Sequence, residues 1–401
     1  MSFKIRISNL KFVIFKYLWF LILAPKSVQF ILLAILAFLF CTKKIELDKV
    51  SICFIGMALI QILAIIVQVL SVQVDVERLL AAINTSLIWI VALLLYSFYR
   101  QTKIDDIDIT KIARYTFIDL LILIFIYVFY LFADKNVYNL FGYNFVLKRM
   151  DYLASGTTTR FCGGMETVLC PSHLFCILSP IIVLLSGAIK SKRLPLIMIS
   201  GMFLSVIGTH SRTGILVCGF IFIFYITYFI TNSVFFQKYK RPILFTLLFL
   251  VVLFCLLNSN SIISMLNKML NSRVGSNNAR FSIYENSIKK TISESPMIGI
   301  GIKYMLGDFP YGSHCTYIGI FYKTGLFGTL LFVIGIAMMC INIWNNISNK
   351  ETGRLAYIMI LSYFGLLIFS DIDASNWVLS LAFICYGLLN NRNFTSICLE
   401  K

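Results

Sequence analysis

The sequence predicts an all-α fold, a polytopic transmembrane helical bundle of about twelve spans with a large outer loop that contains an amphipathic helix. Hydrophobic residues make up 59 % of the 401-residue chain, and only 13 % are Asp, Glu, Lys or Arg, about half the charged share of soluble domains. Apolar runs recur along the whole chain, and a membrane span needs roughly 20 apolar residues. These observations exclude an ordinary soluble protein and favour one integral membrane domain over residues 1–401.

Breaking the apolar runs at charges and at Pro or Gly clusters gives twelve candidate spans. They cover residues 12–24, 28–41, 50–70, 79–98, 115–133, 167–188, 194–209, 213–231, 243–258, 315–343, 355–371 and 375–390. Only Pro25, Lys26 and Ser27 separate the first two. These two form either one broken helix or a tight hairpin, and the later alternation favours the hairpin.

The basic residues predict the orientation of the bundle. On one side, the short loops hold twenty Lys and Arg residues, within 4–11, 43–49, 100–114, 190–193, 238–241, 350–354, 392 and 401. The short loops on the other side hold only Lys26, Arg78 and Arg212. The first side, with both termini, is therefore expected to be cytoplasmic, and loops 134–166 and 259–314 are expected to face outward. Since these tracts carry much of the net charge of +17, no basic face remains for nucleic acid.

The short turn over residues 208–214 carries His210 and Arg212 at the expected outer boundary of the membrane. A charge at that depth is costly and is usually functional or paired. The alternative for Arg212 is a structural one, in which its side chain snorkels to the lipid headgroups.

The second outer loop is predicted to contain an amphipathic helix. Phe281, Tyr284, Ile288 and Ile292 recur at spacings of three, four and four, which gives a helix one apolar face. Asn277 or Asn278 is expected to cap it. Arg280 then falls in the first turn, where free N–H groups and the helix dipole favour a bound diphosphate.

Two further patterns are read as structural. Gly299 and Gly301 lack the third glycine and the flanking strand and helix of a dinucleotide-binding fingerprint, so close packing of a re-entrant turn is expected. No Cys and His spacing is typical of a metal site, although Cys162, Cys170 and Cys315 fall near the same expected face, as free thiols or with one disulfide among them.

The order of these motifs resembles the O-antigen ligase and polymerase superfamily of bacterial membrane glycosyltransferases. The likeness rests on the Ser-Arg-Thr-Gly turn at 211–214, Arg280 before the aromatic helix, Glu294–Gly301, and His314 with the Thr-Tyr-Ile-Gly and Lys-Thr-Gly stretches that follow it. It is strongest over residues 208–335, and Thr159–Gly164 with Pro171 is similar to an upstream stretch of the family. Lys323 departs from the family pattern, because many relatives carry an acidic residue before the glycine of the Lys-Thr-Gly stretch. This departure leaves the identity of the general base less certain.

The resemblance implies a bacterial inner-membrane enzyme that transfers a sugar chain from a polyprenyl diphosphate to an acceptor hydroxyl on the outer face. No metal or cofactor is expected if fixed cations neutralise the leaving diphosphate. Arg212 and Arg280 are expected to bind that diphosphate, with Arg160 and Arg273 as weaker candidates for substrate capture. His314 is the expected general base, the alternative being a structural histidine hydrogen-bonded at a helix end.

Three more residues complete the expected substrate contacts. Tyr284 lies on the aromatic face of the outer helix, and Glu285 is an outside candidate for orienting or replacing the base. His210 is expected to support or pack beside the site rather than to react.

Within the family, polymerisation of repeat units into O-antigen or capsular polysaccharide is favoured over ligation, because the loops are short. The expected partners are the lipid-linked oligosaccharide and the bilayer, with a chain-length regulator and a repeat-unit flippase. A transporter or flippase is the alternative of another class, but transporters typically carry intramembrane carboxylates or an internal repeat. Here the spans hold almost no acidic residue, and Asp371 and Asp373 fall at a loop edge.

Overall fold

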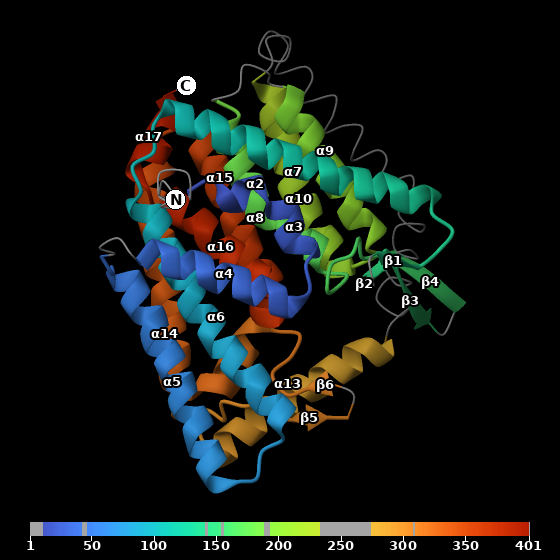
Figure 1. Ribbon diagram of the computed structural model, residues 1–401, viewed down its shortest axis with the longest axis vertical. Coiled ribbons are helices and arrows are strands. Elements are labelled where there is room, and N and C mark those ends of the chain that lie inside the picture. The colour runs from blue at the N-terminus through green and yellow to red at the C-terminus, as the bar shows by residue number, and fades with distance from the viewer. Residues whose placement is uncertain are drawn as a thin grey trace, which may run out of the picture.

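The computed structural model describes residues 11–41, 46–140, 143–153, 156–187, 193–232, 274–307 and 309–400. This part of the chain is mostly helical, as predicted, and its helices pack into one bundle (Figure 1). The predicted span 243–258 and the candidate residue Arg273 lie outside the described residues.

Helices occupy the eleven other predicted spans. They are α2 (Val13–Lys16) with α3 (Leu18–Leu23), α4 (Lys26–Cys41), α5 (Lys49–Ser71), α6 (Val76–Gln101), α7 (Asp106–Phe132), α8 (Cys170–Leu185), α9 (Arg193–Gly208), α10 (Arg212–Thr231), α14 (Thr316–Ile347), α15 (Glu351–Leu366) and α16 (Asn376–Leu389). Among the described helices, α5, α6, α7, α10 and α14 are long and apolar enough to cross a membrane, and α4, α8, α9 and α16 are shorter apolar helices. The total of twelve crossings stays a prediction. Two further helices are α13 (Val274–Glu294) and α17 (Arg392–Glu400).

The first predicted span is split, and it forms a hairpin with the second. Tyr17 leaves the helical conformation (φ −125°, ψ 26°) and separates α2 from α3. The carboxylate of Asp119 on α7 lies near the N–H groups of Leu18 and Trp19 at the start of α3. Ala24 is extended before Pro25, and α4 then runs back beside α3 (Figure 1).

The all-α prediction is incomplete, because the loops that are predicted to face outward contain three small antiparallel sheets. They are β1 (Val137–Leu140) with β2 (Tyr143–Val146), β3 (Lys148–Leu153) with β4 (Gly156–Phe161), and β5 (Met305–Leu306) with β6 (Phe309–Pro310). The first two hairpins follow α7 at one edge of the bundle (Figure 1). Their aromatic, β-branched and threonine residues favour strands, but the segments are too short to stand out among long apolar helices.

The C-terminal third of the chain packs against the N-terminal helices. Helix α14 lies along α5, and α16 lies along α6. At this junction Phe54, Trp89, Phe332 and Phe383 form a ring cluster with centroids 5.1 to 6.0 Å apart. Aromatic burial of this kind stabilises contacts that are far apart in sequence.

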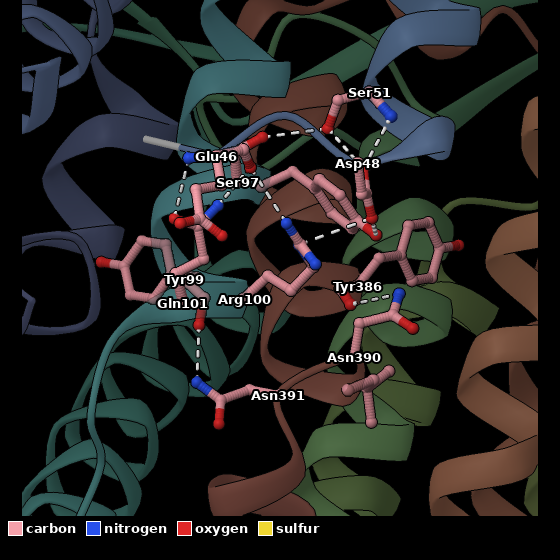
Figure 2. Close-up of polar contacts among 12 residues, drawn as sticks. Glu46, Asp48, Ser51, Ser97, Tyr99, Arg100, Gln101, Tyr386, Asn390 and Asn391 are labelled. Atoms are coloured by element: carbon pink, nitrogen blue, oxygen red, sulfur yellow. Dashed lines mark hydrogen bonds and ion pairs between the residues drawn. The ribbon is translucent and has the colours of Figure 1, made fainter. Parts of the chain in front are cut away.

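One end of the bundle holds a polar network that joins several predicted cytoplasmic segments (Figure 2). The Asp48 side chain accepts from Ser51 N (2.8 Å) and lies 3.4 Å from the Arg100 guanidinium. Asn391 donates to the carbonyl oxygens of Tyr99 (2.9 Å) and Thr102 (2.7 Å). Hydrogen bonds at helix ends satisfy the backbone groups that a helix leaves open, so this network fixes α5, α6 and α16 at the same end.

Helix α14 is broken at Gly325, whose backbone is far from helical (φ 59°, ψ −160°). The break frees the carbonyl groups of Tyr322 and Lys323. They accept hydrogen bonds from Ile300 N (2.8 Å) and Gly301 N (3.1 Å). The loop after α13 therefore lies directly against the interrupted helix and replaces its missing hydrogen bonds.

Gly299 and Gly301 allow this close approach, which confirms the close packing that the sequence predicts. Both have a left-handed backbone with φ 75°, a conformation that costs other residues free energy. A Cβ atom at Gly299 would lie 2.4 Å from Thr324 N, and one at Gly301 would lie 2.6 Å from Ile65 N. No side chain fits between these backbones.

We therefore expect Gly299→Ala to cost about 3 kcal/mol of folding free energy, from overpacking and a strained backbone together. Gly307→Ala is the matched control, since Gly307 has a similar φ of 60° but no atom within 4 Å of an added Cβ. It should cost about 1 kcal/mol. The unfolding midpoint of the detergent-purified protein measures both, and equal shifts would contradict the close packing.

Candidate functional site

A cavity of about 900 Å³ opens among the loops at the end of the bundle opposite the network of Figure 2. Residues from α4, α5, α6, α8, α10, α13 and α14 line it, together with residues of the β3–β4 hairpin and of the loops after α13 and α15. The volume is at the upper end of the range usual for ligand pockets. Segments that the charge pattern assigns to outer loops thus meet at one site.

Helix beginnings surround this cavity. Lining residues lie at the start of α4 (Lys26), α6 (Arg78) and α10 (Arg212), and just before the start of α8 (Leu169), α14 (His314) and α16 (Ala374). Each helix start presents free N–H groups and the positive end of its dipole. Such a convergence favours a negatively charged ligand.

The lining side chains add much more positive than negative charge. The basic ones are Lys26, Arg78, Arg149, Arg160, Arg212, Arg280, Lys303 and Lys323. The acidic ones are Asp371 and Asp373, and both are paired with lysines: Lys303 Nζ lies 2.5 Å from Asp371, and Lys323 forms an ion pair with Asp373. The two carboxylates therefore neutralise two of the eight cations.

The β3–β4 hairpin places two arginines side by side. Arg149 and Arg160 are directly paired across the strands, an arrangement in which like charges repel. Arg160 is 8 % exposed, and its Nε donates to the carbonyl of Thr209 at 2.6 Å. The pair is destabilising by itself and becomes favourable when an anion lies between the guanidinium groups.

The turn between α9 and α10 positions Arg212. Ser211 caps α10, with its side chain accepting from Gly214 N at 3.3 Å, so Arg212 is the first residue of the helix. Its guanidinium lies close enough to that of Arg280 for the two charges to repel. The structure thus brings together the two arginines that the sequence predicts to bind diphosphate.

Helix α13 begins at Val274, which corrects the predicted cap. Residues 277 and 278 lie inside the helix, and Arg280 is its seventh residue rather than part of the first turn. The chain from 274 to 276 continues the helix, so an asparagine has no free first-turn N–H to cap. Arg280 reaches the cavity from the side of α13 and does not use the helix dipole.

The predicted apolar face of α13 is not the face that packs against the rest of the protein. Ile283, Ser287 and Thr291 are buried, whereas Phe281 (69 % exposed), Ile288 and Ile292 point outward. Small polar side chains allow α13 to lie close to the loop at 311–314. The apolar side chains form an exposed stripe suited to lipid or to a lipid chain.

Helix α13 carries Arg280 and is hydrogen-bonded to the backbone at His314, so it fixes the positions of these two residues relative to each other. The Tyr284 hydroxyl donates to the His314 carbonyl oxygen (2.9 Å), and Gly312 N donates to Ser287 Oγ (2.8 Å). Arg280 lines the cavity one turn from Tyr284, and its buried Nε–H has no hydrogen-bond partner among the described residues. A buried donor of this kind is costly unless a ligand satisfies it.

His314 has the chemical form that a base requires. Its backbone is left-handed (φ 65°), and its ring packs edge-on against Phe309 at 5.2 Å. Burial, together with the charges of Arg280 and Lys303, lowers the pKa of His314 to about 4. The imidazole is therefore neutral above about pH 5 and can accept a proton.

Some predicted site residues are not brought to the cavity. His210 is exposed and Glu285 pairs with Lys289 at 2.6 Å, and neither side chain lines the cavity. Tyr284 is not a lining residue, and it contacts the site through the His314 backbone. Cys162, Cys170 and Cys315 are all free thiols, so the disulfide alternative is wrong for these three.

Sequence reasoning did not assign a role in the site to several lining residues. Lys303, Lys323, Asp371 and Asp373 form two ion pairs, and His173 binds the Tyr363 hydroxyl through Nδ1 at 3.1 Å. The partners lie 50 to 190 positions apart, so no local pattern joins them. Lys323 stands where many relatives carry an acidic residue, and in this protein Asp373 supplies a carboxylate beside it.

Comparison with known proteins agrees with the resemblance. Residues 197–333 match a family model described as O-antigen ligase. The match includes Arg212, Arg280, His314 and Lys323 and covers about a third of the chain. No curated protein matches the chain. Residues 197–333 are thus similar to the O-antigen ligase family, and the long apolar helices indicate an integral membrane protein.

The lowered pKa of His314 predicts how a histidine reagent reacts with it. Diethyl pyrocarbonate attacks the neutral imidazole, so its relative rate at His314 should be half-maximal near pH 4, whereas free N-acetylhistidine should be half-maximal near about 6.5. Mass spectrometry of the modified peptide measures the rate at each pH. Arg280→Ala should move the midpoint upward by removing a cation, and a wild-type midpoint at 6.5 would place His314 in open water.

Proposed function

We propose that this protein is a membrane glycosyltransferase that polymerises polyprenyl-diphosphate-linked oligosaccharide repeat units on the outer face of the bacterial plasma membrane. One observation supports it above the others, the meeting of Arg160, Arg212, Arg280 and His314 in a single cationic cavity. In this proposal both termini are cytoplasmic, and the cavity opens outward. The product is O-antigen or capsular polysaccharide.

The proposed reaction uses groups already in place. The acceptor sugar hydroxyl gives its proton to the neutral His314 as its oxygen bonds to the anomeric carbon of the donor. The bond from that carbon to the diphosphate oxygen breaks, and the electron pair leaves with the polyprenyl diphosphate. Arg212 and Arg280 bind the added negative charge with paired N–H groups. Arg149 and Arg160 bind the phosphates of the entering lipid.

Binding of the diphosphate also makes His314 a better base. The charge of Arg280 lowers the pKa of His314, and a bound anion cancels that charge. The pKa then rises toward the value that suits proton transfer near neutral pH. The base is strengthened only when the donor is present.

The paired carboxylates support an enzyme rather than a transporter. Ion-coupled carriers use intramembrane carboxylates that gain and lose a cation or a proton. In the cavity, Asp371 and Asp373 are each held by a lysine, and Trp89 Nε1 also donates to Asp373 at 3.1 Å. Because both carboxylates are paired within the protein, they are not suited to bind and release a transported cation or proton.

The exposed stripe of α13 suits a lipid substrate. Phe281, Ile288 and Ile292 lie on the outer side of the helix whose Arg280 lines the cavity. A polyprenyl chain that lies along this stripe keeps its diphosphate within reach of Arg280. In this proposal residues 278–294 control entry of the lipid, and a chain-length regulator and a repeat-unit flippase act beside the enzyme.

Glycans from a deletion strain test polymerase against ligase. Loss of a polymerase leaves single repeats on the final acceptor, whereas loss of a ligase leaves long chains on the carrier lipid. Complementation with Arg280→Ala should abolish the ladder of chain lengths, and Arg280→Lys should only shorten it, because lysine keeps the charge but not the paired N–H groups. A normal ladder with the alanine variant would remove Arg280 from the mechanism.

Tyr284→Phe should lower the rate of donor consumption about fivefold to tenfold, because the hydrogen bond that holds the His314 backbone is worth about 1 kcal/mol. Tyr317→Phe is the matched control. Its hydroxyl also donates to a backbone carbonyl, that of Phe364 at 3.0 Å, but Tyr317 does not line the cavity. Both variants should lose similar stability, and equal losses of rate would refute a specific role for Tyr284.

A further inference from the structure

Gln61 on α5 is a fully buried side chain with unmet hydrogen bonds. It is 0 % exposed, and neither its amide nitrogen nor its amide oxygen has a partner among the described residues. It lines the cavity that also contains Arg280 and His314. A primary amide offers two donor hydrogens and an acceptor oxygen. The amide of Gln61 can therefore both donate and accept hydrogen bonds with a ligand in the cavity.

Gln61 lies far from both ends of α5, and at such a position a polar group without hydrogen bonds raises the free energy of the fold. It stands ten residues before the end of α5 at Ser71, a distance of about 15 Å along the helix. That is about half the thickness of a bilayer core. Polar groups at such depth face the protein interior and are usually functional, since lipid offers no hydrogen bonds.

Helices α6 and α14 pack against α5, and apart from Arg78 the residues that they contribute to the cavity wall have little net charge. Lys323 and Asp373 form a buried ion pair, so they cancel each other. Thr85 donates its hydroxyl hydrogen to the Ala81 carbonyl (2.8 Å) and keeps its acceptor lone pairs. Ala81 and Ala82 have small side chains and leave room beside them. This part of the wall suits a neutral polar ligand, in contrast to the arginine-rich part.

We propose that Gln61 and Thr85 form a subsite for hydroxyl or acetamido groups of the sugar attached to the diphosphate. The proposal rests on the proposed function, because the same cavity must hold the lipid-linked donor. Sugar hydroxyls both donate and accept, which matches an amide and a threonine hydroxyl. The cations bind the diphosphate, and Gln61 makes binding depend on the sugar. The subsite therefore selects the repeat unit.

Binding of defined short-chain lipids tests this subsite. The probes are farnesyl diphosphate and its conjugates with glucose, galactose and N-acetylglucosamine, titrated into the full-length detergent-purified protein. We expect the wild type to bind at least one conjugate about tenfold more tightly than the bare diphosphate, the gain from one or two neutral hydrogen bonds. Gln61→Met should bind the conjugate and the bare diphosphate equally.

Two controls separate a binding role from a structural one. Gln68→Met changes a glutamine on the same helix that bonds the Tyr304 hydroxyl (3.3 Å) and does not line the cavity, and it should keep the tenfold preference. Gln61→Met should unfold at the same temperature as the wild type or a higher one, because it loses no protein hydrogen bond. A lower midpoint with loss of both ligands would make Gln61 structural and overturn the proposal.

The remaining outcomes are also decisive. If Gln61→Met keeps the preference for the conjugate, Gln61 does not contact the sugar. If the wild type prefers none of the three conjugates, the amide binds only water and the subsite is refuted. If the wild type binds neither the conjugates nor farnesyl diphosphate, while the protein is folded, the proposed function itself fails. Arg280→Ala should weaken binding of all four lipids alike, which distinguishes diphosphate binding from sugar binding.

Discussion

An excess of positive charge around one cavity is the constraint on which the site depends. Eight basic side chains line one cavity with two carboxylates, and six helices begin around it. Like charges gathered around one cavity repel one another, and the fold has to hold them in position. It does so with ion pairs to Asp371 and Asp373 and with the bond from Arg160 to the Thr209 carbonyl. An anionic ligand relieves the remaining repulsion, which is why a diphosphate fits this cavity.

Two departures from regular helical backbone, at Gly325 and at His314, position residues of the cationic cavity. The break in α14 at Gly325 admits the glycine loop, which leads to Lys303 and to the strands β5 and β6. The left-handed backbone at His314 turns the chain into α14, and Tyr284 on α13 holds it there. Strained backbone persists when the surroundings fix it, and it is common at functional sites. Here α13 is the element that ties the base to the arginine.

Much of the helical pattern could be predicted, and much of the site could not. Helices occur at eleven predicted spans because length and apolar composition are local properties of a segment. The hairpins at 137–161 were missed, because their signal is short and lies between long helices. The first turn of α13 was misplaced, because an asparagine predicts a cap only if the residues before it leave the helix. Arg212, Arg280 and His314 were identified through the order of motifs, not through any contact between them.

The sequence by itself determined where the membrane helices lie and which loops carry the arginines, because both depend on neighbouring residues. Only the tertiary structure decided which polar groups meet. It paired Lys323 with Asp373, placed Arg149 opposite Arg160, and left the amide of Gln61 facing the cavity without a partner among the described residues. Such pairings depend on how helices far apart in sequence pack together. The free energy of a buried charge or amide depends on those neighbours, and a linear pattern does not contain them.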